Sequence, residues 1–146
     1  MTKLTNLERT RIQMQYAVPL IRDLQEILGE QVINDALGEM HRRREKRAAQ
    51  SAREADFTRM KAGTDMFAAG GALDYEITGE SDEHFDMDVT NCRYAELMAD
   101  MDATDIGTLL ICNGDFADAL KIGMELKRTQ TRMQGADCCD FRYCRR

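Results

Sequence analysis

The chain has 146 residues, of which 43% are hydrophobic, and it carries a formal net charge of −6. This length and apolar content are typical of one globular domain, so we expect residues 1–146 to form a single domain. The excess of acidic groups disfavours contact with a phosphate backbone and excludes nucleic acid as an expected partner.

Helical patterns dominate residues 1–69. Thr5-Asn-Leu-Glu8 has the capping-box pattern of a helix start, and Gly29 is a typical residue for the end of that helix. Pro19 lies between these points and predicts a kink or a restart of the helix. A second helix is expected to run through the basic cluster His41–Arg47 towards Ala55, with that cluster on a solvated face. Residues 57–69 form a third, weaker helical pattern that ends at two glycines.

Residues 72–146 mix strands with short helices. Apolar and polar residues alternate in two segments joined by a polar turn, and two more strands are expected near the C-terminus. The predicted strands are 73–77, 85–89, 124–133 and 138–143, and the predicted short helices are 93–101, 106–111 and 116–120. This order predicts an α+β fold, with N-terminal helices packed on one face of a small, mainly antiparallel sheet interrupted by short helices.

The first helix carries more apolar surface than such a small sheet can cover. We therefore expect a homo-oligomer formed through the N-terminal helices. No apolar run approaches the length of a signal peptide or a membrane span, so we expect a cytoplasmic protein with no membrane partner. Five cysteines, an odd number, are then expected to be free thiols, metal ligands or a nucleophile rather than a disulfide framework.

The most distinctive segment for chemistry is Gly135-Ala-Asp-Cys-Cys-Asp-Phe-Arg-Tyr143. A thiolate attacks electrophilic carbon, and a neighbouring carboxylate can take or orient a proton. Strand alternation places Cys139 on the core face with Phe141 and Tyr143, and Cys138 with Asp140 on the polar face. Either cysteine could therefore be the reactive thiol, and both could instead be small apolar residues of the core.

A second candidate is Cys112-Asn-Gly-Asp115. Asn-Gly favours a tight turn, and Asp115 either caps the helix that follows or supplies a hydrogen-bonding group at a pocket mouth with Asn113. His84 and Cys92 stand at opposite ends of one predicted strand. His84 is a surface residue or, if it faces a pocket, an acid or base.

Several signatures of known chemistry are missing from the sequence. It has no phosphate-binding glycine loop, no dinucleotide fingerprint, no C-x-x-C pair and only two histidines. Cys92, Cys112 and Cys138 or Cys139, with an aspartate, could supply zinc ligands, but their spacings match no common zinc pattern. We therefore expect neither a metal nor another cofactor.

Three segments together carry a family resemblance. Val89-Thr-Asn-Cys-Arg-Tyr-Ala-Glu96, Leu110-Ile-Cys-Asn-Gly-Asp115, and Leu126-Lys-Arg-Thr-Gln-Thr131 followed by residues 135–143 resemble the L-2-amino-thiazoline-4-carboxylic acid hydrolase family. The likeness extends over about residues 10–143. It implies hydrolytic opening of a small heterocycle with a C=N bond: water adds to the carbon between nitrogen and sulfur, the thiolate leaves, and N-carbamoyl-L-cysteine results.

The resemblance also implies roles for particular residues. Cys139 would be the nucleophile, with Cys138 in reserve, and Asp140 would orient it or accept its proton. Asn113 and Asp115 would bind the amidine nitrogens, because a carboxylate pairs well with an amidinium. The substrate carboxylate would bind Arg93 or Arg132, and Cys92 would line the site. The alternatives are a non-catalytic domain that binds or senses a small molecule, and a structural partner protein with inert cysteines.

Overall fold

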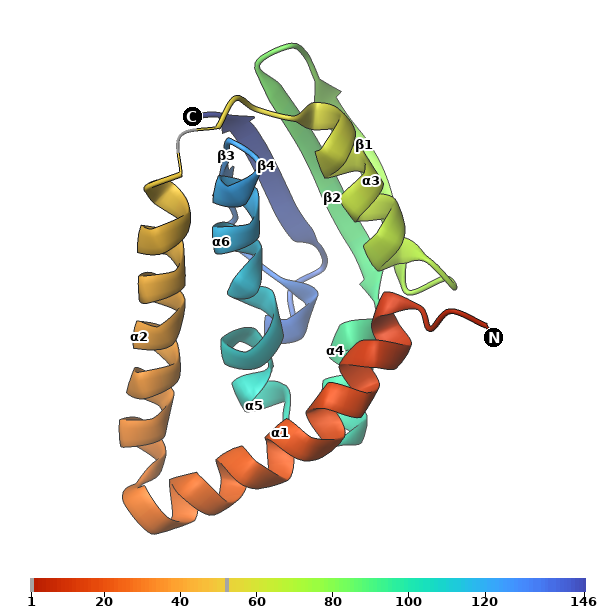
Figure 1. Ribbon diagram of the computed structural model, residues 1–146. Coiled ribbons are helices and arrows are strands. Elements are labelled where there is room, and N and C mark those ends of the chain that lie inside the picture. The colour runs from red at the N-terminus through yellow and green to blue at the C-terminus, as the bar shows by residue number, and fades with distance from the viewer. Residues whose placement is uncertain (1, 52) are drawn as a thin grey trace.

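The computed structural model describes residues 2–51 and 53–146 and has the α+β architecture that the sequence predicts (Figure 1). A four-stranded sheet in the described part of the chain is antiparallel throughout, with strand order β1-β2-β4-β3. Its strands are β1 Leu73–Glu80, β2 His84–Cys92, β3 Met124–Lys127 and β4 Cys139–Arg145. The prediction of the fold class is therefore confirmed.

Helices precede the sheet and interrupt it. They are α1 Asn6–Leu28, α2 Glu30–Ala49, α3 Phe57–Ala68, α4 Arg93–Asp100, α5 Thr104–Gly107 and α6 Gly114–Lys121. A π-helical turn, η1 Thr108–Cys112, joins α5 to α6, and a 3₁₀ turn, η2 Arg132–Gln134, precedes β4. In the described residues no helix is both long enough and apolar enough to cross a membrane.

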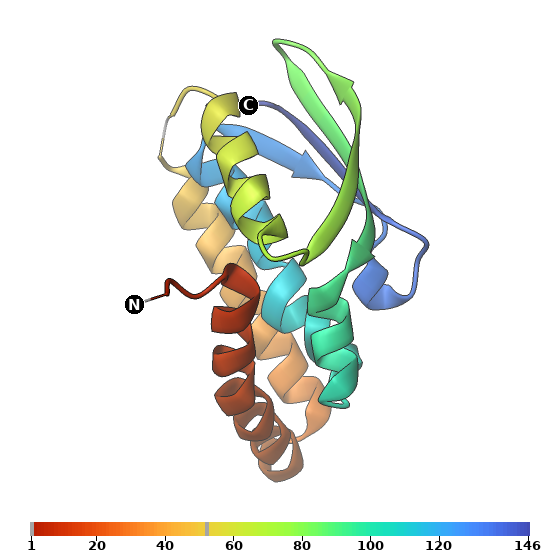
Figure 2. The same ribbon diagram turned by 90° about the vertical axis from the view of Figure 1, so that its right-hand side faces the viewer.

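Helices cover one face of the sheet, and Figures 1 and 2 show α3 and α6 on this side. α1 and α2 form a long hairpin that packs on α4, α6 and the end of α3. The strand residues on the covered face are buried, among them Phe85, Met87 and Val89 of β2. Their alternating neighbours on the other face are charged, and Arg142 forms an ion pair of 2.8 Å with Asp88 there.

Two groups of buried side chains form the core. One fills the space between α1, α4 and α5, and its most buried members are Ala72, Met98, Ala103 and Ile106. The other lies between the sheet and α3 and contains Met60, Phe85, Met124 and Cys139. Leu73 and Cys92 pack against both groups, so the strand pair β1–β2 links the two halves of the core.

Local signals set both ends of α1. Thr5 and Glu8 form the predicted capping box, in which Thr5 N donates to Glu8 Oε2 at 2.7 Å and Glu8 N donates to Thr5 Oγ1 at 3.2 Å. Gly29 ends the helix with a φ of 99°, which glycine adopts without steric cost. Pro19 neither ends nor restarts the helix, because α1 continues through it.

Three predictions of local structure were wrong. α2 ends at Ala49 rather than continuing towards Ala55. His41 is buried rather than solvated, and because a carbonyl only accepts, its Nε2–H donates to Leu109 O at 2.6 Å. β3 stops at Lys127, because the chain then leaves the sheet towards η2.

Candidate active site

A cavity of about 520 Å³ lies between the covered face of the sheet and helices α3 and α6. Its walls are mainly apolar, with polar groups at a few positions, which is typical of small-molecule sites. Met66, Asp118 and Lys121 belong to the lining, and each has between 47% and 63% of its surface exposed. The cavity therefore reaches solvent between α3 and α6.

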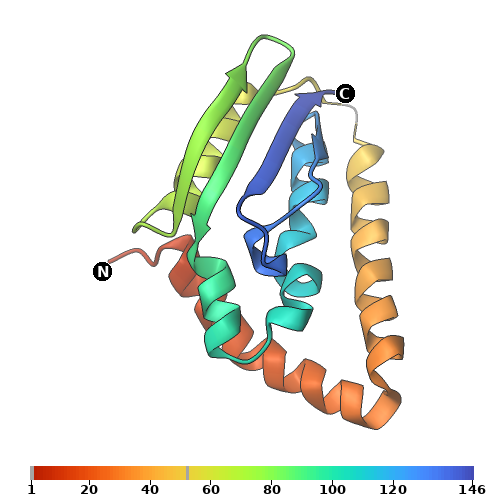
Figure 3. The same ribbon diagram turned by 180° about the vertical axis from the view of Figure 1, so that it is seen from behind.

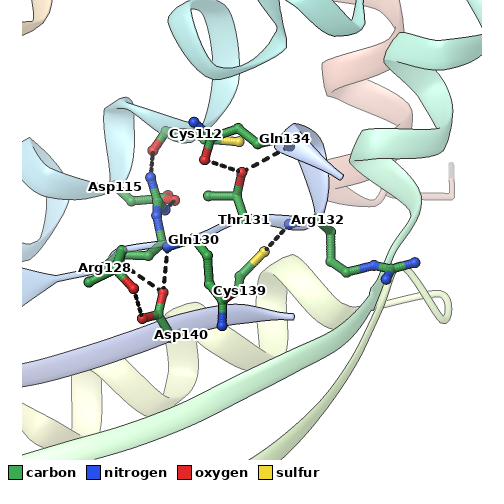
Figure 4. A network of polar contacts seen from close by, with 10 residues as sticks. Cys112, Asp115, Arg128, Gln130, Thr131, Arg132, Gln134, Cys139 and Asp140 are labelled. Carbon is green, nitrogen blue, oxygen red and sulfur yellow. Dashed lines mark hydrogen bonds and ion pairs between the residues drawn. The ribbon is translucent and has the colours of Figure 1, made fainter. Parts of the chain in front are cut away.

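The Cys139 thiol belongs to this lining. Cys139 is the first residue of β4, it pairs with Val89 of β2, and it is 6% exposed. The backbone N–H of Arg132 donates to Cys139 Sγ at 3.1 Å (Figure 4). Burial raises the pKa of the Cys139 thiol to about 11, although the hydrogen bond from Arg132 opposes that rise.

The Asp115 carboxylate lines the same cavity from the first turn of α6. One oxygen, Oδ2, accepts a hydrogen bond of 2.6 Å from Arg128 Nη1. Within the described residues Oδ1 has no hydrogen-bond partner, and the side chain is 26% exposed. Burial raises the pKa of Asp115 to about 6, because the attraction of Arg128 only partly offsets the loss of solvation. The carboxyl group is therefore half protonated at about pH 6.

Arg128 holds this carboxylate in place, and it was not among the site residues predicted from the sequence. Its guanidinium lies between two aromatic rings, with Cζ 5.0 Å from the Phe116 centroid and 5.1 Å from that of Phe141. It also donates from Nη2 to Cys112 O at 3.0 Å, and its side chain is only 4% exposed. Met124 and Leu126 are buried on β3, so alternation continued by one step would have placed Arg128 on the inner face.

Two further thiols line the cavity. Burial raises the pKa of Cys112 to about 12 and also raises that of Cys92. In the described chain, no group of three or more His, Cys, Asp and Glu side chains is arranged to hold a metal ion.

Comparison with known proteins gives one family. The model of the L-2-amino-thiazoline-4-carboxylic acid hydrolase family matches residues 9–143. The chain belongs to this family. The cavity lies entirely within the matched region, and the family is named for a hydrolase. No curated protein matches the chain.

Asp140 of this family member lies on the opposite face of the sheet from the cavity. Successive residues of a strand point to opposite faces, so Asp140 cannot share the pocket of Cys139. Its carboxylate accepts from Thr129 N, Thr129 Oγ1 and Gln130 N at 2.9, 2.5 and 2.8 Å (Figure 4). Burial alone would raise the pKa of Asp140, but these hydrogen bonds outweigh it and lower the pKa. Asp140 fixes residues 129–130 against β4.

Other predicted site residues also lie outside the cavity lining. The side chain of Arg93 is 45% exposed and lies 3.9 Å from Glu96. The Arg132 guanidinium donates to Ala136 O and Asp137 O, and Arg132 lines a separate surface groove. Cys138 accepts from Gln130 Nε2 at 3.4 Å on the same side as Asp140. Asn113 is the residue before α6 and is not part of the cavity lining. Asp115, two residues later, lies in the first turn of α6 and therefore does not cap the helix.

His84 lies at the far end of the β1–β2 hairpin. It is on the outer face of β2, where its Nδ1 is 2.7 Å from Ser81 Oγ and its Nε2 is 3.8 Å from Asp86. Of the nine residues first considered for the site, the cavity therefore brings together Cys92, Asp115 and Cys139.

Proposed function

We propose that this protein is a hydrolase that opens a small heterocycle containing a C=N bond, with 2-amino-thiazoline-4-carboxylate as the reference substrate. One observation carries the proposal: a buried thiol and a carboxylate with one free oxygen line the same cavity in a chain of this family. The cavity has room for a five-membered ring and its substituents, and its walls are largely apolar.

Asp115 is the proposed partner of the substrate's amidinium. Arg128 occupies Oδ2, which leaves Oδ1 to accept a hydrogen bond from a ring or exocyclic N–H. The charge pair keeps the amidine protonated, and a protonated C=N carbon is more readily attacked. Arg128 itself is a positioning residue, because its donors are engaged by Asp115 and Cys112.

Arg59 is the proposed partner of the substrate carboxylate. It lines the cavity from α3, near the mouth, and it makes no ion pair within the described residues. Lys121, which also lines the mouth, is already paired with Asp118 at 2.8 Å. Arg59 therefore takes the role that the family resemblance implied for Arg93 or Arg132.

Cys139 is the proposed nucleophile. Its sulfur adds to the carbon between nitrogen and sulfur, the ring C–S bond breaks, and the departing sulfur takes up the proton of the thiol. The carbon is then joined to Cys139 as an isothiouronium group. Water adds to that carbon, the bond to Cys139 breaks, and a urea, the regenerated thiol and one proton result. The backbone N–H of Arg132 stabilises the negative charge that develops on the Cys139 sulfur as it attacks and again as it departs.

The test is turnover of 2-amino-thiazoline-4-carboxylate, measured as carbamoyl product by mass spectrometry. We expect Cys139→Ala to lower kcat about a thousandfold or more, as loss of a nucleophile does in other enzymes. Cys144→Ala is the matched control, because Cys144 is on the same strand and outside the cavity lining. Unchanged turnover in Cys139→Ala would refute the thiol as nucleophile and leave water as the attacking group.

A non-catalytic binding domain is the second candidate. The raised pKa values of Cys92, Cys112 and Cys139 favour it, because at neutral pH these thiols are mostly protonated and weakly nucleophilic. Calorimetric binding of the ligand to the wild type, without any product after long incubation, would establish this function in place of the enzyme.

A further inference from the structure

The outward face of α1 carries an exposed apolar stripe. Ile12, Tyr16 and Leu20 are spaced four residues apart, and they are 55%, 75% and 43% exposed. At 100° per residue they lie opposite the buried side of the helix, which is formed by Leu7, Met14, Val18 and Ile21. In the described part of the chain these three side chains remain uncovered, although exposed apolar groups aligned in this way usually contact a partner.

Charges at the two ends of the stripe are opposite. Arg9 lies three residues before Ile12, and Asp23 lies three residues after Leu20. Both are exposed, both fall on the outward face, and neither forms an ion pair within the described residues. Along the helix the order is therefore positive, apolar, Tyr16, apolar, negative, with spacings of three, four, four and three residues.

When a second helix with this order runs in the opposite direction, its negative end faces the positive end of the first helix and its apolar residues face apolar residues. We propose that two copies of the chain associate through α1, antiparallel, about a two-fold axis at Tyr16. The axis sets Ile12 against Leu20 of the second copy and Arg9 against its Asp23, and symmetry repeats both contacts. Each helix contributes about 21 Å of length between Arg9 and Asp23, from the rise of 1.5 Å per residue.

A parallel arrangement would oppose Arg9 to Arg9 and Asp23 to Asp23, which like charges disfavour. Figure 3 shows α1 at the edge of the molecule, along the end of the fold away from the β-hairpin tip.

A charge exchange tests this interface directly, with sedimentation velocity as the measurement. We expect the wild type to dimerise, and either Arg9→Asp or Asp23→Arg alone to raise the dimer dissociation constant about tenfold or more, because each creates two like-charge contacts per dimer. The double variant Arg9→Asp with Asp23→Arg restores opposite charges and should recover dimerisation. Both positions are exposed, so all three variants should fold.

The variant Tyr16→Glu is a second, independent test of the proposed interface. It places two carboxylates at the axis and should give a monomer with unchanged circular dichroism. A monomeric wild type at high protein concentration would overturn the proposal. So would a dimer that persists in Tyr16→Glu, or a double charge exchange that fails to restore what the single variants lose. None of these outcomes depends on whether the cavity performs catalysis.

Discussion

At the scale of single residues, the site depends on one ion pair in the cavity wall, between Arg128 and Asp115. Arg128 is held by two aromatic rings and by Cys112 O, so its position does not require Asp115. Asp115 in turn is held at one oxygen and left free at the other. A carboxylate fixed in this way needs little reorganisation to receive a cation, which is the physical basis of pre-organised binding.

The pH dependence of substrate capture follows from Asp115. Burial raises the pKa of this carboxyl to about 6, so it becomes protonated as the pH falls through that value and can no longer pair with an amidinium. We expect kcat/KM of the wild type to fall about tenfold for each pH unit below about 6. The measurement is a pH profile from 4.5 to 8.

The matched variant is Asp115→Asn, which removes the charge and nearly preserves the shape. It should lower kcat/KM across the whole range and flatten the acid side of the profile. An acid limb that survives unchanged in Asp115→Asn would assign the titration to another group.

At the scale of elements, a tight contact joins the start of β3 to the α2–α3 linker. Gly123 has a φ of +74°, and a Cβ built on it would lie 2.5 Å from Arg53 O and from the backbone of Glu54. The N–H of Asp56 also donates to Ile122 O at 3.0 Å, so the linker runs against this turn. The atoms nearest to this Cβ all belong to the backbone, so no flexible side chain could move aside to make room for it.

Gly123→Ala should therefore be much more damaging than an alanine at a comparable glycine. Gly71 has a φ of +72° and nothing within 4 Å of the built Cβ, so Gly71→Ala measures the backbone cost alone. We expect a loss of about 1–2 kcal/mol for Gly71→Ala and about 2–4 kcal/mol for Gly123→Ala in urea unfolding. Equal losses would mean that the linker moves aside freely.

At the scale of the whole molecule, the cavity is a space left between two layers, the sheet and the helices that cover one of its faces. The sheet supplies Cys139 and the helical layer supplies Asp115, and both core clusters reach the cavity through Cys92. Binding a ligand between the layers should therefore stabilise the entire fold, since a ligand that binds only the native state shifts the unfolding equilibrium.

Thermal unfolding of Cys139→Ala measures this coupling without turnover. The reference substrate at 100 times its Kd should add about 2.7 kcal/mol and raise Tm by about 5–11 °C. Gly63→Leu should abolish the shift, because Gly63 lines the cavity and open space surrounds its built Cβ. Gly63→Ala, with a smaller group at the same position, should retain most of it. A full shift in Gly63→Leu would place the ligand elsewhere.

Much of the fold could be predicted because its signals are local. The capping box of Thr5 and Glu8, the stop at Gly29 and the alternation of β2 and β4 each involve residues within a turn or a few strand positions. Their outcome depends on chain geometry rather than on distant neighbours. The end of β3 could not be predicted in this way, because only the path towards η2 decides where the chain leaves the sheet.

The site was predicted less completely. Alternation already separated Cys139 from Asp140, and the structure agrees with the alternation rather than with their adjacency in sequence. The burial of Met124 and Leu126 on β3 indicates, by alternation, that Arg128 faces inward. No such pattern pairs Arg128 with Asp115, because Asp115 belongs to a helix in the other layer.

The period of a strand or a helix is enough to predict the class of fold, the inward direction of Cys139 and the self-complementary order along α1. It is not enough to predict that Asp115, Arg128 and Cys139 line one cavity. These residues lie on different elements, and contacts between layers depend on how the helices pack on the sheet, which no local period encodes. The same packing decided that Arg132 lies elsewhere, whereas strand alternation already placed Asp140 on the outer face.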